Sequence, residues 1–139
     1  MKFSPGAFMA LLTTNLDKSI LVVDDYRAMV SIIRRMLFLF GFTKVVDATD
    51  GASALEKLRA GCYSVVISDL MMEPMDGLTL LSRIRSDADL RSTPFVMVTA
   101  SSEEAQILAA KEAGVTAYIL KPFTAEILKK RLSAVLGRF

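Results

Sequence analysis

Acidic, hydroxyl and ammonium side chains follow short apolar runs at separate points of this chain. Asp24 and Asp25 come directly after SILVV, Asp69 after YSVVIS and Lys121 after TAYIL, and Thr99 ends the run PFVMVT. Carboxylates brought together repel one another, and a hard cation such as Mg²⁺ relieves that repulsion through oxygen ligands. A hydroxyl and an ammonium group can hold phosphoryl oxygens, and a carboxylate can accept a phosphoryl group. These residue types therefore indicate Mg²⁺-dependent phosphoryl chemistry.

The apolar runs have the character of buried strands. They are short and rich in β-branched residues, which is typical of strands covered on both faces of a parallel sheet. Strands are expected at 19–23, 43–48, 63–68, 94–99 and 116–120.

Apolar residues at helical spacing follow each expected strand. The first helix runs through 29–40 and stops at Gly41, and the second contains Leu55 and Leu58 and closes at Gly61. The third contains 78–84. The fourth is expected to begin with a capping box of Ser101 and Glu104 and to end at 114, and the last covers 124–136. In the last helix, 127, 128, 132 and 135 are expected on the buried side.

Strands that alternate with helices in this way predict an α/β fold, a doubly wound five-stranded parallel sheet with five helices on its two faces. If the strand order is 2-1-3-4-5, the first and third strands are neighbours. Ligands bind outside the carboxyl ends of such strands, where the order reverses. Asp24, Asp25 and Asp69 would then share one pocket, with Thr99 and Lys121 facing them.

Length and composition exclude several classes of protein. The chain has 139 residues, of which 53% are hydrophobic, so it is expected to form one ordered domain at 18–139 after an N-terminal extension at 1–17. A net charge of +2 does not favour a nucleic-acid binder, and without histidine there is no His-based triad or imidazole metal site. No apolar run approaches the roughly 20 residues of a membrane span. The single Cys62 allows no internal disulfide and agrees with a cytoplasmic location.

Each polar motif also has an ordinary structural interpretation. An acidic pair after a strand is often a helix N-cap, at about even odds. Asp76 followed by Gly77 is typical of a turn, and Lys121 before proline can be a solvated loop residue. The conjunction carries the weight, because an acidic pair, an acid, a hydroxyl and a lysine follow different strands in this order.

At these residues the sequence resembles the response-regulator receiver family of two-component signalling, and in particular its single-domain chemotaxis regulators. The similar segments cover about residues 18–136. They are LVVDD (21–25), the helix through LFLFGF, ATDGASALEKL (48–58), VISDLMMEPMDG (66–77), VMVTA (96–100) and AYILKPF (117–123). The resemblance implies a flavodoxin-like fold with the order 2-1-3-4-5.

The resemblance also implies a role for each site residue. Asp69 would be the phosphoacceptor. Asp25 would bind Mg²⁺ directly, Asp24 would act mainly through a metal-bound water, and the backbone carbonyl of Met71 would complete the ligand set.

Two further roles are implied for the switch. Thr99 and Lys121 would hold phosphoryl oxygens, and Tyr118 occupies the position of the family's rotating aromatic residue. Phosphorylation would pull Thr99 inward and let Tyr118 fill the space behind it, a shift between two packings. Taken alone, Tyr118 is more often a half-buried strand aromatic.

The resemblance implies a phosphorylation-controlled switch rather than an enzyme. Its partners would be a histidine kinase or a histidine phosphotransfer protein, and a downstream protein target. An Mg²⁺-dependent phosphatase with Asp69 as nucleophile is the main alternative, but Met71 stands where such enzymes usually place a general acid. A flavin-binding relative is a third, but Asp24 and Asp25 would repel an anionic phosphate.

Two positions depart from the commonest family pattern. Glu73 stands where proline is usual, with Pro74 one residue later, which affects the expected loop geometry and metal affinity. Met71 is apolar where chemotaxis regulators often carry an amide. We hypothesise that Met71 cannot orient an attacking water, so that an acyl phosphate on Asp69 lives longer.

Overall fold

The computed structural model describes residues 17–137 and 139, so the expected N-terminal extension lies almost wholly outside the described residues. Strands and helices alternate along the described chain. The elements are β1 (Ser19–Val23), α2 (Arg27–Leu39), β2 (Lys44–Ala48), α3 (Gly51–Ala60), β3 (Val65–Asp69), α4 (Gly77–Ser86), β4 (Phe95–Thr99), α5 (Glu104–Glu112), β5 (Ala117–Leu120) and α6 (Ala125–Leu136). The strands and helices expected from the sequence are therefore present, with small differences at their ends.

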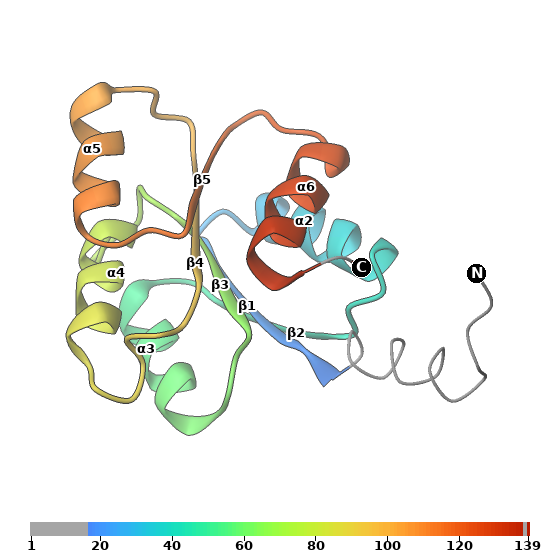
Figure 1. The fold of residues 1–139 in the computed structure, drawn as a ribbon, viewed down its shortest axis with the longest axis horizontal. Helices are drawn as coiled ribbons and strands as arrows, with labels where there is room; N and C mark the ends of the chain where they lie inside the picture. The colour runs from blue at the N-terminus through green and yellow to red at the C-terminus, as the bar shows by residue number, and fades with distance from the viewer. Residues whose placement is uncertain (1–16, 138) are drawn as a thin grey trace.

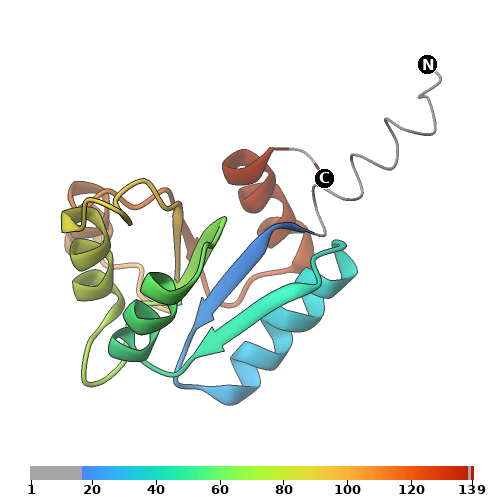
Figure 2. The same ribbon diagram turned by 90° about the horizontal axis from the view of Figure 1, so that it is seen from below.

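The strands form one parallel sheet in the order β2-β1-β3-β4-β5. Helices α2 and α6 cover one face, and α3, α4 and α5 cover the other (Figures 1 and 2). The predicted flavodoxin-like topology is confirmed. Its order reverses between β1 and β3, because β1 pairs with β2 on one side and with β3 on the other.

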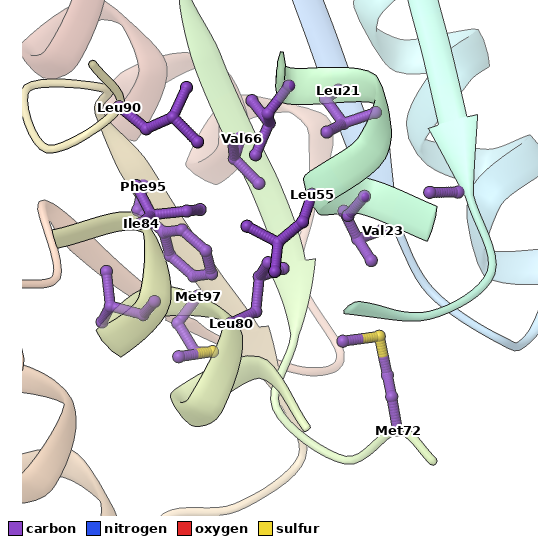
Figure 3. Close-up of a cluster of buried hydrophobic side chains, with 14 of the residues drawn as sticks. Leu21, Val23, Leu55, Val66, Met72, Leu80, Ile84, Leu90, Phe95 and Met97 are labelled. Carbon is purple, nitrogen blue, oxygen red and sulfur yellow. The ribbon is translucent and has the colours of Figure 1, made fainter. Parts of the chain in front are cut away.

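Two apolar cores form because successive strand residues point to opposite faces. In β1, Ile20 and Val22 join the core under α2 and α6, and Leu21 and Val23 join the core under α3, α4 and α5. Figure 3 shows the second core, where side chains of the strands meet those of α3 and α4. The central strands are buried on both faces, so their positions, and those of the residues that follow them, are fixed by packing.

The fourth expected helix begins differently from the prediction. α5 starts at Glu104, its N-cap residue is Glu103, and no side chain caps it. The predicted capping box of Ser101 and Glu104 is wrong, because the Ser101 hydroxyl accepts a hydrogen bond from the Glu103 backbone N–H instead. Ile127 is also wrong as a buried residue: it is 44% exposed on α6, whose buried residues are Leu128 and Leu132.

The expected turn at Asp76 and Gly77 is the start of α4. Asp76 is the N-cap residue, and its carboxylate accepts a hydrogen bond of 2.7 Å from the Thr79 backbone N–H. In the described part of the chain, every helix is too short or too polar to cross a membrane.

Candidate functional site

The reversal of strand order brings three carboxylates together. β1 and β3 are hydrogen-bonded neighbours with Val23 paired to Ser68, so the residues that follow them lie side by side. Asp24, Asp25 and Asp69 each offer an oxygen within 4.8 Å of the other two. The acidic cluster predicted from the sequence is therefore present, and its donor set of hard oxygens fits a small divalent cation such as Mg²⁺.

Lys121 reaches this cluster from the carboxyl end of β5, which is separated from β3 by β4. Its Nζ atom lies 3.4 Å from Asp24 Oδ2 and 3.5 Å from Asp69 Oδ2, and its side chain is only 17% exposed. The backbone N–H of Lys121 donates to the carbonyl of Thr99, which fixes the end of β5 against the end of β4. The interpretation of Lys121 as a solvated loop residue is thereby contradicted.

The two adjacent acids differ in environment. Asp24 is buried, and its Oδ1 accepts a hydrogen bond of 2.9 Å from the Tyr26 backbone N–H while Oδ2 faces Lys121. Asp25 is exposed. Neither acid is the N-cap of α2, because that residue is Tyr26 and no side chain caps the helix. Asp25 therefore has its carboxylate open to solvent, and Asp24 forms the buried wall of the cluster.

Several neighbouring groups act on the carboxyl of Asp69. Burial raises the pKa of its carboxyl, and the nearby charge of Asp24 raises that pKa further. The ammonium of Lys121 and the backbone N–H groups of Met71 and Leu70 act in the opposite direction. The Leu70 N–H donates to Asp69 Oδ1 at 2.8 Å. A carboxylate that is partly desolvated but still oriented by donors suits a nucleophile.

Thr99 and Tyr118 are linked through one residue of the loop after β4. Thr99 is fully buried, and its Oγ1 accepts a hydrogen bond of 3.3 Å from the Ser101 backbone N–H. The Tyr118 hydroxyl donates to the Ser101 carbonyl at 2.9 Å. Burial of Tyr118, together with the charge of Glu103, raises the pKa of its phenol. The two predicted switch residues thus each form a hydrogen bond with the backbone of Ser101.

The loop between β3 and α4 depends on Gly77. Its backbone N–H donates to the Leu70 carbonyl at 2.8 Å, and a Cβ atom at this position would lie only 2.2 Å from the Asp69 carbonyl oxygen. Only glycine lets α4 start this close to the end of β3. This requirement is not predicted from the sequence, although the Asp-Gly pair at Asp76 and Gly77 is its visible sign.

The two unusual loop residues lie outside the acidic cluster. Glu73 is exposed and is not part of the group formed by Asp24, Asp25 and Asp69. The Met71 side chain is 63% exposed and lines a groove of about 420 Å³ with 100–103 and Gln106. An exposed apolar side chain thus lies two residues after the phosphoacceptor candidate.

The fold and the site together define a class: an open, doubly wound α/β protein with an acidic, lysine-bearing site at the topological switch point of its sheet. Residues 20–133 match the response regulator receiver domain family, and the chain belongs to this family.

Comparison with individual proteins agrees with that assignment. The chain is 40% identical over 129 residues to the chemotaxis protein CheY-3 of Vibrio cholerae, covering 93% of this chain and 98% of that protein. It is 40% identical over 119 residues to the chemotaxis protein CheY of Pseudomonas aeruginosa, covering 86% and 96%.

Two solved structures have a fold similar to that of this chain. The chemotaxis response regulator CheY4 of Vibrio cholerae superposes with a TM-score of 0.79 at 31% identity, covering 86% of this chain and 98% of that one. The receiver domain of a Pseudomonas aeruginosa sensor histidine kinase has a TM-score of 0.79 at 26% identity, with the same coverage, and carries a magnesium ion coordinated in its active-site cleft.

Proposed function

We propose that this receiver domain accepts a phosphoryl group on Asp69 and signals through the resulting change in its surface. The observation that carries the proposal is the position of Lys121, whose ammonium nitrogen lies within 3.5 Å of Asp69 inside an acidic cluster. A lysine held there has a fixed positive charge next to the candidate nucleophile. Such a charge stabilises the phosphoryl oxygens during transfer.

The proposed transfer is a displacement at phosphorus. A carboxylate oxygen of Asp69 forms the new P–O bond as the P–N bond of a phosphohistidine breaks, and the electron pair leaves on the imidazole nitrogen, which is then protonated. Lys121 and the Thr99 hydroxyl would hold the phosphoryl oxygens as the group arrives. Burial of Asp69 excludes some of the water that would otherwise compete.

The proposed site binds Mg²⁺, with the carbonyl of Met71 as a further ligand. The close approach of the carboxylates of Asp24, Asp25 and Asp69 supports this part of the proposal. Asp25 would bind the ion directly, since its carboxylate is exposed, and buried Asp24 would act mainly through a metal-bound water. The ion would neutralise negative charge shared by the carboxylates and the phosphoryl group.

The proposed switch uses the contact between Thr99, Ser101 and Tyr118. A phosphoryl group on Asp69 would draw the Thr99 hydroxyl toward it and so remove the acceptor of the Ser101 N–H. Since the Tyr118 hydroxyl bonds to the carbonyl of the same residue, the position of the loop and of Tyr118 would change together. Phosphorylation would thereby shift the population of two packings on the α5, β5 and α6 surface.

The similarity to chemotaxis proteins supports a role in chemotaxis or a related phosphorelay, in the cytoplasm. The proposed partners are a histidine kinase or histidine phosphotransfer protein as donor, and a downstream protein as target. We infer a signalling protein that assists its own phosphorylation and dephosphorylation, and not an enzyme acting on external substrates. Met71, at the position of a phosphatase general acid, has no proton to donate, which argues against the phosphatase alternative.

The test is incubation with Mg²⁺ and a small phosphodonor such as phosphoramidate, followed by intact mass measurement. We expect an adduct of about 80 Da, one HPO₃, on the wild type and none on Asp69→Asn. An equal adduct on both proteins, or none on either, would refute the proposal. Hydrolysis of a generic phosphate ester at enzymatic turnover would instead favour the phosphatase.

A further inference from the structure

Among the methionines of the described residues, Met71 is the one most exposed to solvent. Its side chain is 63% exposed, whereas Met72 is 5% and Met97 0% exposed, and the other three methionines in the described part of the chain are partly buried. Figure 3 shows Met72 extending from the same loop toward the apolar core. A thioether is oxidised where an oxidant can reach its sulfur, so neighbouring residues in one loop should differ sharply in reactivity.

The exposed thioether belongs to a residue whose backbone contacts the candidate phosphoacceptor. Met71 follows Asp69 by two residues, and its backbone N–H hydrogen-bonds the Asp69 carboxylate. Its side chain lines the groove of about 420 Å³ between the loops that follow β3 and β4, together with 100–103 and Gln106. A chemical change at this sulfur therefore takes place on the residue whose backbone N–H contacts the Asp69 carboxylate.

The groove has polar groups that can accommodate a more polar side chain. The Ser101 hydroxyl accepts from the Glu103 backbone N–H and keeps its own proton free to donate. An oxidised Met71 can thus remain in the groove, where water and the Ser101 hydroxyl are available as donors to its oxygen.

We propose that Met71 is a redox-sensitive modification site, and that its oxidation to the sulfoxide shortens the lifetime of the phosphoryl group on Asp69. The proposal rests on the proposed function of Asp69. The oxidant is a hydroperoxide. The thioether sulfur attacks the terminal peroxide oxygen, an S–O bond forms as the O–O bond breaks, and the leaving oxygen is protonated to water or an alcohol. The sulfur is oxidised by two electrons, and the peroxide is reduced by two.

The effect on lifetime follows from the polarity of the new group. A thioether is a weak acceptor that gives an approaching water no orientation, whereas a sulfoxide oxygen accepts hydrogen bonds well. A water held by the sulfoxide oxygen can then attack phosphorus. The P–O bond to Asp69 breaks, its electron pair returns to the carboxylate, and phosphate leaves with one proton of that water while the other passes to solvent. We expect decay to accelerate by roughly fivefold, since a neutral acceptor orients water without acting as a full general base.

The first experiment maps oxidation on the intact protein. Limited treatment with hydrogen peroxide, followed by fragment-ion mass spectrometry, should show a gain of about 16 Da on Met71 before one on Met72 or Met97. Methionine sulfoxide reductase should reverse it. Equal oxidation of all three, or earlier oxidation of a buried one, would overturn the assignment.

The second experiment measures the lifetime. Oxidised and untreated protein are loaded with phosphoramidate and Mg²⁺, the donor is removed, and the adduct is followed by intact mass. Decay should be faster after oxidation in the wild type, equal before and after it in Met71→Leu, and permanently fast in Met71→Asn. Unchanged decay of the oxidised wild type, or equal acceleration in Met71→Leu, would refute the proposal. Failure of every sample to form an adduct would refute the proposed function, whereas the oxidation map would still stand or fall separately.

Discussion

The ammonium nitrogen of Lys121, at the end of β5, lies 3.5 Å from a carboxylate oxygen of Asp69, at the end of β3. The two residues belong to strands that do not touch, because β4 lies between them. The same nitrogen lies 3.4 Å from Asp24, so one cation serves two acids that are otherwise close enough to repel each other.

Replacing this cation should weaken both the fold and the chemistry. Lys121→Met keeps much of the side-chain length and leaves two carboxylates without their partner, so we expect a loss of about 1–3 kcal/mol of stability in EDTA. The variant should also gain the phosphoryl adduct far more slowly, as measured by intact mass. Lys121→Arg, which keeps the charge, is the control for stability. A Met variant as stable and as reactive as the wild type would contradict the role of Lys121.

Mg²⁺ should stabilise the protein by binding only its folded state. At about a hundred times the dissociation constant, the gain is about 2.7 kcal/mol, or roughly 10 °C in melting temperature for a domain of this size. Asp25→Asn removes a proposed ligand and should reduce this shift in a thermal melt with and without Mg²⁺. Ca²⁺-free EDTA buffer supplies the baseline. An undiminished shift in the variant would show that Asp25 is not a ligand.

The metal-free stability should depend on pH through Asp69. The pKa of Asp69 is raised in the folded protein, so as pH rises the unfolded chain loses the Asp69 proton at a lower pH than the folded protein does. The free energy of unfolding is therefore highest at low pH and declines as pH rises through the folded-state pKa. Asp69→Asn removes the cost of burying the ionised carboxyl. Its melting temperature in EDTA should exceed that of the wild type at pH 7, and the difference should shrink toward pH 4. A constant difference across this range would contradict the raised pKa.

Gly77→Ala should destabilise the protein by forcing the loop after β3 away from the start of α4. The added Cβ would lie 2.2 Å from the Asp69 carbonyl oxygen, a contact that only backbone movement relieves, and overpacking of this kind costs about 3 kcal/mol. Gly61→Ala is the matched control, since its nearest neighbour would be at an ordinary 3.6 Å. Denaturant unfolding of both variants measures the difference. A Gly77→Ala protein no less stable than Gly61→Ala would show that the loop after β3 moves away from the new Cβ without a cost in stability.

The sequence by itself determined the succession of elements, because strands buried on both faces and helices with one apolar side leave distinct patterns. It also identified the polar residues that follow the strands, including Asp24, Asp69 and Lys121. Element ends were less accurate: β3 begins at Val65 and not at Tyr63, and the expected cap at Ser101 is replaced by a local bond to Glu103. Such ends depend on competition between nearby backbone donors, which short-range patterns do not resolve.

Only the tertiary structure decided how closely the distant residues approach. The sequence placed Lys121 at a strand end, but the 3.5 Å separation from Asp69 depends on the packing of β4 between their strands. The same holds for Gly77: a side chain is excluded at this position because the backbone of Asp69, in β3, lies too close. It holds also for the exposure of Met71, since burial is a property of everything that surrounds a side chain and not of its neighbours in sequence.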